Sequence, residues 1–214
     1  MWFPTVGLLL GGILALADLG LRTLGVQPLV ESSLLVVLLL GLTGGLHADG
    51  LMDTCDAVFA HASPERRLEI MRDPRVGSFG VIGFASILVL KLAAVQALPA
   101  TRAQALLLAP VLGRWAIVLL AAAFPPGRAS GLGAPVKAAA SPKLLALASA
   151  VPLALSVALG PTGLWLLSLA AVTALLIGWS LCRLLPGLTG DCYGAACECV
   201  ETSVLLLAGA LAIS

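Results

Sequence analysis

The chain has too little charge for an ordinary soluble domain. Only 11% of its 214 residues are charged, whereas a typical soluble protein has roughly 25%, and the mean hydropathy is +1.08. The net charge is +1, so no broad basic field indicates binding to nucleic acid. These shortages exclude an ordinary soluble enzyme and a nucleic-acid partner, and they favour a polytopic membrane protein.

Cysteine is also scarce. The chain has five cysteines, an odd number, and no long region outside its apolar runs, which excludes a disulfide framework. Cys192, Cys197 and Cys199 lie close together, but their spacing matches no common metal-ligand pattern. We interpret them as small apolar side chains of a helix, with a metal cluster as the alternative.

The first twenty residues lack the basic start and the cleavage site of a signal peptide. We therefore expect them to form a retained helix. Glycine, in contrast, is abundant, with 23 residues. Two pairs, Gly7 with Gly11 and Gly41 with Gly45, have the spacing that favours close packing of membrane helices.

Long apolar runs dominate the sequence. A membrane-spanning helix needs about 20 mostly apolar residues, and the candidates are 3–19, 29–46, 79–98, 104–124, 144–160, 162–182 and 200–213. Gly160-Pro161 alone separates the fifth run from the sixth, which predicts a tight turn. We predict an all-α polytopic integral membrane protein with six or seven transmembrane helices, forming one catalytic domain over residues 1–214.

Lysine and arginine are unequally distributed between the two sides of this predicted bundle. Connections after even-numbered helices carry eight of them, and those after odd-numbered helices carry only Arg22 and Arg102. By the positive-inside rule the first set faces the cytoplasm. The polar motifs lie on that side, so we expect an active site at the cytoplasmic mouth. The connection 125–143, rich in Pro and Gly, predicts a loop over this mouth.

An acidic stripe forms the first polar motif, within the stretch 44–80. Asp49, Asp53 and Asp56 stand at i, i+4 and i+7, so a helix places their carboxylates on one face. Like charges repel at this spacing, and Mg²⁺ accepts a few carboxylates together with water and substrate phosphates. We predict a magnesium site, with a solvated acidic surface as the alternative. The neighbouring His47 is a candidate base or ligand.

Arginines and glycines form the second motif, which ends at Gly80. Arg75 presents a fork of donors that suits phosphate oxygens, and the glycines permit close approach of another backbone or ligand. We predict that Arg72 and Arg75 bind substrate. The alternative, that the arginines only anchor the topology, is favoured for Arg66 and Arg67.

The third motif lies near the C-terminus. Asp191, Glu198 and Glu201 fit one helical face, and the two glutamates run into apolar sequence, where an unpaired carboxylate is costly. We predict that they bind metal or substrate or act as a base. The alternative is pairing within the membrane with Lys91 or Arg114, the two cations inside predicted spans.

The first and third motifs resemble one another. Gly45-Leu46-x-x-Asp49 is repeated as Gly187-Leu188-x-x-Asp191, and each aspartate is followed seven residues later by another acid. This internal similarity predicts two acidic helix starts that face a single site.

Together the motifs resemble the cobalamin synthase family, the adenosylcobinamide-GDP ribazoletransferases. The matching blocks are GGLHADGLMDTCDAVF, RRLEIMRDPRVGSFGVIG and GLTGDCYGAACECVE, and the start WFPTVGLLLG is similar to that family's first long helix. The resemblance implies a bacterial inner-membrane enzyme that joins adenosylcobinamide-GDP to α-ribazole or its 5′-phosphate. It also implies release of GMP and a requirement for Mg²⁺. Separately, we expect contact with membrane lipid and association into a homo-oligomer.

The resemblance and the residue patterns together give the expected site. Ala57 departs from the family pattern, which usually has glycine there. The proton acceptor is expected to be Asp191 or His47. The expected metal ligands are Asp49, Asp53, Asp56 and Glu198, and the expected substrate-binding residues are Arg72, Asp73, Arg75, Gly77, Ser78, Arg114, Arg128 and Glu201.

Two other kinds of protein fit parts of the pattern. CDP-alcohol phosphotransferases share an acidic helix around Mg²⁺, but their D-G-x-x-A-R core is replaced here by Asp49-Gly50-Leu51-Met52-Asp53-Thr54. A transporter would suit the intramembrane Lys91 and Arg114. However, transporters place their sites near the midplane, whereas these motifs cluster at one mouth.

Overall fold

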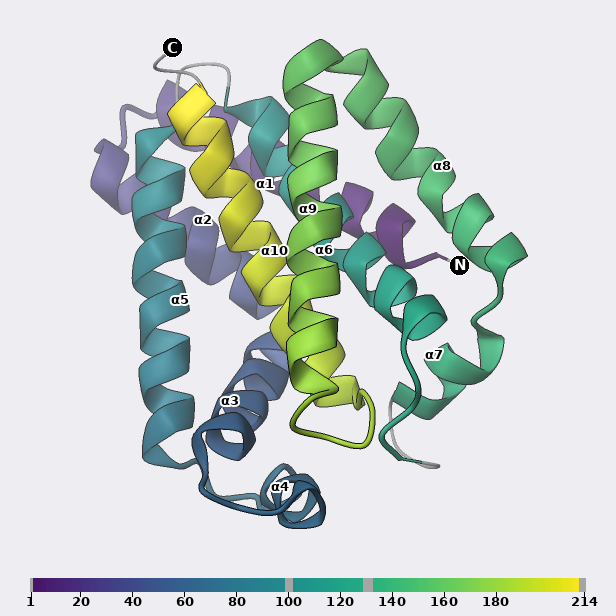
Figure 1. Cartoon of the computed structure of the whole chain (residues 1–214). Helices are drawn as coiled ribbons and strands as arrows, with labels where there is room; N and C mark the ends of the chain where they lie inside the picture. Colours follow the sequence, from purple (N-terminus) through teal and green to yellow (C-terminus); the bar gives the residue numbers. More distant parts are fainter. Residues whose placement is uncertain (1, 99–101, 129–132, 212–214) are drawn as a thin grey trace.

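The computed structural model describes residues 2–98, 102–128 and 133–211, and Figure 1 shows these ranges as a bundle of helices. The helices are α1 (Phe3–Thr23), α2 (Pro28–Leu42), α3 (Leu46–Phe59), α4 (Pro64–Ile70), α5 (Ser78–Ala97), α6 (Ala103–Ala123), α7 (Gly133–Ala139), α8 (Pro142–Ala158), α9 (Gly160–Leu181) and α10 (Gly190–Leu211).

Helices α1, α5, α6, α9 and α10 are each long and apolar enough to cross a bilayer. Two further pairs, α2 with α3 and α7 with α8, are bent by 88° and 103°, which gives up to seven spans in the described ranges. The prediction of a polytopic all-α membrane protein is confirmed. The predicted tight turn is also confirmed, because Gly160 adopts a φ of 66° where α8 meets α9.

Two of the predicted helix boundaries were wrong. The run 29–46 was predicted as one helix, but α2 ends at Leu42 and α3 begins at Leu46. Gly44 and Gly45 between them have φ values of 58° and 70°, a left-handed conformation that glycine adopts readily. The last helix was predicted from residue 200, but α10 begins at Gly190 and carries the whole third motif on its first turns.

Helix α6 occupies the centre of the bundle, where it packs mainly against α1 and α10. Contact between α1 and α6 is very close. A Cβ atom on Gly11 would lie 2.7 Å from the Cα atom of Leu107, and one on Gly7 would lie 2.7 Å from that of Val111. The predicted packing role is thus confirmed for this pair. For Gly41 and Gly45 it was wrong, because a Cβ atom on either would meet nothing within 4 Å.

Replacing Gly11 by Ala is therefore expected to destabilise the bundle, by about 1–3 kcal/mol as for other overpacked cores. Gly12 is a matched control on the same helix, because its added Cβ atom would meet nothing within 4 Å. Gly12→Ala should be neutral or slightly stabilising, since Ala is the better helix former. Thermal unfolding of the two variants in the same detergent measures the difference. Equal midpoints would show that the close contact does not determine stability.

The two ends of the bundle carry different polar groups. The first end holds α3, α4 and the loop before α10, seen at the bottom of Figure 1. Across the opposite end, where α1 finishes and α2 and α6 begin, Arg102 is buried and pairs with Asp18 and Glu31. Arg22 also lies 3.3 Å from both carboxylates. This buried cluster joins three helices far from the sequence motifs.

The connection 125–143 is only partly the predicted loop. It contains α7, and it crosses the loop before α10, where the Gly127 N–H donates to the Leu188 carbonyl at 2.8 Å. The Leu188 N–H in turn donates to the Pro125 carbonyl at 2.9 Å. Residues 129–132 of this connection lie outside the described ranges. The crossing fixes Arg128 beside the start of α10.

Candidate active site

The starts of α3 and α10 pack directly against one another. A Cβ atom on Gly50 would lie 2.8 Å from the carbonyl oxygen of Asp191, and one on Gly194 would lie 3.1 Å from that of His47. A side chain at Gly50 would force the backbone of α10 to move, and one at Gly194 would make a tight contact. The internal similarity of the two motifs predicted acidic helix starts facing one site, and the structure does place these starts side by side.

Acidic side chains from both helices gather at this seam. Asp49, Asp56 and Asp191 all lie within electrostatic range of Asp53, and so does the guanidinium group of Arg128. Arg128 approaches Asp191 to 3.5 Å. Several carboxylates thus share a small region with one arginine. Such an arrangement favours a cation, because like charges at close range repel.

Arg128 and Thr189 hold Asp191 in place. The Thr189 hydroxyl donates to the Asp191 carboxylate at 3.2 Å and accepts from the Cys192 N–H at 3.4 Å, which caps the start of α10. Arg128 also donates to the carbonyl of Leu68 on α4 at 2.6 Å. Sequence reasoning did not select Thr189. A threonine just before the helix start was the available signal.

Asp56 connects the first motif to the second. Its carboxylate accepts hydrogen bonds from the Gly77 N–H at 2.7 Å and the Gly80 N–H at 2.8 Å, at the start of α5. A carboxylate is favourable at a helix N-terminus, where N–H groups lack partners within the helix. A Cβ atom on Gly80 would lie 2.5 Å from this carboxylate. The glycines predicted to permit close approach therefore admit Asp56 itself.

A polar groove of about 240 Å³ opens beside this contact. It is lined by Asp56, Arg66, Glu69, Ile70, Asp73, Arg75, Gly77, Ser78 and Phe79. Arg75 donates to both oxygens of Asp73, at 2.9 and 2.7 Å, and these bonds hold the pKa of Asp73 down to about 2. The groove therefore combines most of the predicted substrate residues of the second motif. Arg72 is exposed in the turn that follows α4.

The other arginines and lysines near this end mainly complete helix ends. Arg67 donates to the Ala57 carbonyl at 2.7 Å, which closes the end of α3. Arg66 forms an exposed pair with Glu69 at 2.6 Å. Lys137 donates to the carbonyls of Ala121 and Phe124 at the end of α6. The topology role preferred for Arg66 and Arg67 stays a prediction, and Arg66 also lines the polar groove.

The glutamates of the third motif lie deeper in the bundle. Lys91 on α5 donates to Glu198 at 2.5 Å and to Glu201 at 2.7 Å, and Arg114 on α6 also pairs with Glu201. All four side chains are buried. Pairing within the membrane, the alternative weighed for the two glutamates, is therefore present. Their assignment as metal ligand and substrate contact stays a prediction.

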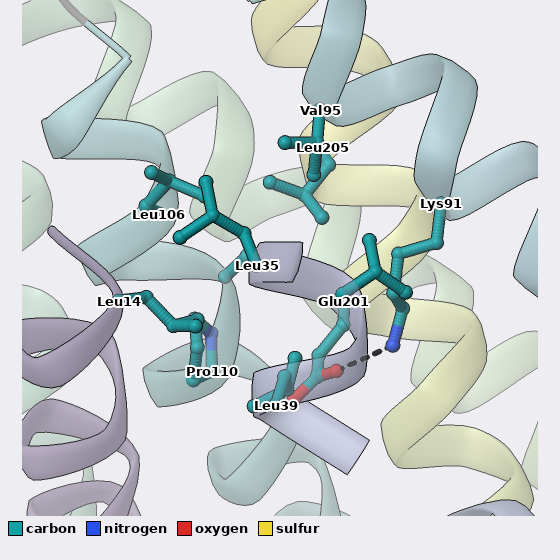
Figure 2. A pocket seen from close by; sticks show the side chains of 11 residues that line it. Leu14, Leu35, Leu39, Lys91, Val95, Leu106, Pro110, Glu201 and Leu205 are labelled. Atoms are coloured by element: carbon teal, nitrogen blue, oxygen red, sulfur yellow. Dashed lines mark hydrogen bonds and ion pairs between the residues drawn. The ribbon is translucent and has the colours of Figure 1, made fainter. Parts of the chain in front are cut away.

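The space beside this interior network is small. Figure 2 shows Lys91 reaching Glu201 among aliphatic side chains that include Leu35, Leu39 and Leu205. The cavity there measures about 10 Å³, close to the minimum for one water molecule. A transporter would need a substrate site near this depth, and this cavity has no room for one.

The described residues contain no ready-made metal cage. Across residues 2–98, 102–128 and 133–211, no three His, Cys, Asp or Glu side chains are arranged to hold a metal ion. All five cysteines are free thiols, and Cys192 and Cys197 are fully buried in α10. The burial of Cys192 and Cys197 in α10 agrees with our interpretation of these two as small apolar side chains of a helix.

Comparison with known proteins assigns the family. The model of the family described as cobalamin-5-phosphate synthase matches residues 1–209. A Roseiflexus sp. (strain RS-1) relative named adenosylcobinamide-GDP ribazoletransferase is 43% identical over 205 residues, which is 95% of this chain and 76% of the relative. No solved structure matches the chain.

Two further relatives carry the same name. The one from Desulforamulus reducens is 42% identical over 209 residues, 96% of this chain and 83% of the relative. The one from Stutzerimonas stutzeri is 42% identical over 206 residues, with shares of 95% and 83%. The chain therefore belongs to the cobalamin-5-phosphate synthase family and is a membrane transferase of cobalamin biosynthesis, as its motifs predicted.

Proposed function

We propose that the chain joins adenosylcobinamide-GDP to α-ribazole, or to its 5′-phosphate, and releases GMP in a reaction that depends on Mg²⁺. The observation that carries this proposal is the seam between α3 and α10, where Asp49, Asp53 and Asp191 gather beside Arg128. Carboxylates next to an arginine match the needs of a phosphoryl transfer, which relies on positioning and on electrostatic stabilisation.

The carboxylates of the seam fit a magnesium ion that is completed by substrate. Mg²⁺ commonly uses one or two protein carboxylates and takes its other ligands from water and phosphates. Asp49 and Asp53 would hold the ion, because the two oxygens of Asp56 already accept hydrogen bonds from α5. A bound ion would neutralise charge on the pyrophosphate.

Arginines next to the seam would hold the phosphate groups. Arg128 is anchored to α4 and directed at Asp191, so it stays near the carboxylates before substrate binds. Arg75 lies in the polar groove with one edge of its guanidinium group, formed by Nε and Nη2, bound to Asp73. The groove lies on the side of Asp56 that faces α4.

Asp191 is the best-placed proton acceptor for the 5′-hydroxyl of the ribazole. It sits on the first turn of α10, is held by Thr189, and faces the carboxylates of α3. The hydroxyl oxygen would attack the phosphorus on the cobinamide side as its proton passes to Asp191. The bond to the GMP oxygen would break, and GMP would leave with the other phosphate. His47 is the second candidate for this role.

The chain is expected to lie in the bacterial inner membrane with the first end towards the cytoplasm. Eight of the lysines and arginines lie in the connections at that end by the sequence count, and nucleotides are found in the cytoplasm. The positive-inside rule gives the same orientation. The polar groove and the seam would then open towards soluble substrates.

A product assay with purified protein tests this proposal. The protein, reconstituted into lipid nanodiscs, is supplied with adenosylcobinamide-GDP and α-ribazole, and products are identified by mass spectrometry. We expect a cobamide and an equal amount of GMP with Mg²⁺, and neither product when a chelator removes the ion. Formation of product at the same rate after chelation would contradict the metal requirement. Absence of product in every condition would contradict the proposed reaction.

A further inference from the structure

A second groove, more apolar than the first, lies between α1 and the junction of α2 with α3. Its walls and floor are formed by Trp2, Phe3, Val6, Leu10, Leu42, Thr43, Leu46, His47 and Arg114, and its volume is about 390 Å³. Small-molecule sites usually measure about 300–1,000 Å³ and combine apolar walls with a few polar groups. This groove, called the apolar groove below, has those properties.

The walls are exposed, but the polar floor is not. Trp2 is 67% exposed and Leu46 55% exposed, whereas Arg114 is only 2% exposed and pairs with Glu201. The Nδ1 atom of His47 is buried and has no hydrogen-bond partner within the described ranges. The half-buried imidazole also lines the groove and forms no hydrogen bond with the described residues, so it retains hydrogen-bonding capacity that the protein does not use.

These features indicate what kind of group occupies the groove. A lipid acyl chain would cover the apolar walls but would give the imidazole no hydrogen bond. A charged phosphate would lose its hydration against Phe3 and Leu10. A flat aromatic ring system that carries a single hydrogen-bonding nitrogen satisfies both the walls and the floor, and aromatic neighbours such as Trp2 and Phe3 favour it.

The groove also lies at the right place relative to the seam. Gly194 packs against the carbonyl of His47, and Gly50 packs against the carbonyl of Asp191. On α3, His47 and Gly50 are three residues apart, and on α10 so are Asp191 and Gly194. Three residues span about 4.5 Å along a helix axis. His47 therefore lies about one helical turn from the position that packs against Asp191, a separation that a ribose attached to a ring in the groove can bridge.

We propose that the apolar groove binds the aromatic base of the acceptor, and that the imidazole of His47 hydrogen-bonds to the ring nitrogen that carries no sugar. This inference rests on the proposed function, in which the acceptor is α-ribazole, a benzimidazole joined to ribose. With its base in the groove, the ribose extends from His47 with its 5′-hydroxyl towards Asp191. His47 is then a residue that determines acceptor binding, not the proton acceptor.

Filling the groove separates this role from the reaction itself. Val6 lines the groove and is 51% exposed, whereas Leu9 is 65% exposed on the same helix and does not line it. In nanodiscs, Val6→Trp should raise the KM for α-ribazole about tenfold or more, since the bulk displaces the base. The KM for adenosylcobinamide-GDP should stay within about twofold. Leu9→Trp should leave both constants near the wild-type values.

Variants of His47 test the hydrogen bond. His47→Leu should raise the KM for α-ribazole about tenfold, the factor that corresponds to one lost hydrogen bond. Asn and Gln place an amide near the positions of the two imidazole nitrogens, so one of His47→Asn and His47→Gln should recover most of the affinity. His61→Leu, at the exposed second histidine, is the matched control. A fall in kcat without a change in KM would instead assign His47 to proton transfer and overturn the inference.

Direct binding completes the test. Equilibrium dialysis of α-ribazole against wild-type protein, without adenosylcobinamide-GDP, should show saturable binding that Val6→Trp loses and Leu9→Trp keeps. Equal binding by both variants would overturn the inference. The inference would also be overturned if the activity of Val6→Trp changed only with the lipid of the nanodisc, because the groove would then contact lipid and not the acceptor. Wild-type protein that binds α-ribazole but forms no product would contradict the proposed function and leave this site supported.

Discussion

Asp53→Asn is expected to lower the rate of GMP release by about 10²- to 10³-fold, the effect typical of removing one electrostatic group from an active site. The substitution keeps the shape of the side chain and removes its charge. Asp53 lies between Asp49, Asp56 and Asp191, so its loss reduces the negative charge available to hold a cation. The rate should recover partly at high Mg²⁺ concentration, because the variant binds the ion more weakly.

The measurement is GMP release as a function of Mg²⁺ concentration, by protein in nanodiscs. Glu65→Gln is the matched control, since Glu65 is an exposed carboxylate on α4 at the same end of the bundle. This control should keep the wild-type rate and the wild-type Mg²⁺ dependence. Undiminished turnover by Asp53→Asn would remove Asp53 from the metal assignment, and reduced turnover in the control would indicate a general effect of surface charge.

Lys91→Met should cause the largest loss of stability, about 3–5 kcal/mol, as is usual when one partner of a buried ion pair is removed. Lys91 is 3% exposed and contacts both Glu198 and Glu201. Arg114 still pairs with Glu201 in the variant. Glu198 then remains buried without a counter-charge, and this unpaired carboxylate is the main source of the loss.

A second substitution tests that explanation. Adding Glu198→Gln to Lys91→Met removes the unpaired charge, so the double variant should be more stable than Lys91→Met alone. Lys143→Met, at an exposed lysine, should be neutral. Equilibrium unfolding in mixed detergent micelles gives the free energies, and the double-mutant cycle gives the coupling between the two sites. Strictly additive effects would mean that Lys91 and Glu198 do not stabilise one another.

Hydropathy and residue spacing were sufficient for the fold class and for part of the packing. The apolar runs gave α5, α6 and α9 within a few residues, and the spacing of Gly7 and Gly11 predicted the close contact with α6. The same spacing failed for Gly41 and Gly45. The conformation at Gly45 depends on where α3 must lie, and periodicity carries no information about that.

The partners of charged residues were harder to predict. Both Lys91 and Arg114 were suitable partners for Glu198 and Glu201 from sequence, and the structure uses Lys91 for both and Arg114 for one. Such pairs join residues about 90–110 positions apart, so they depend on how three helices pack. The role of Asp56 was missed for the same reason, because its partners lie on the following helix.

The hydrogen bonds from Gly77 and Gly80 to Asp56 connect the first motif directly to the second. Helix α5 begins at this contact and carries Lys91 further along its length. A substitution at Asp56 is therefore expected to shift the start of α5 and alter the polar groove. Because α5 also carries Lys91, the same shift is expected to affect the interior ion pairs. Comparing Asp56 variants with Asp53 variants separates the positioning of α5 from the binding of a cation, because Asp56 holds the start of α5 and Asp53 is a proposed ligand of the cation.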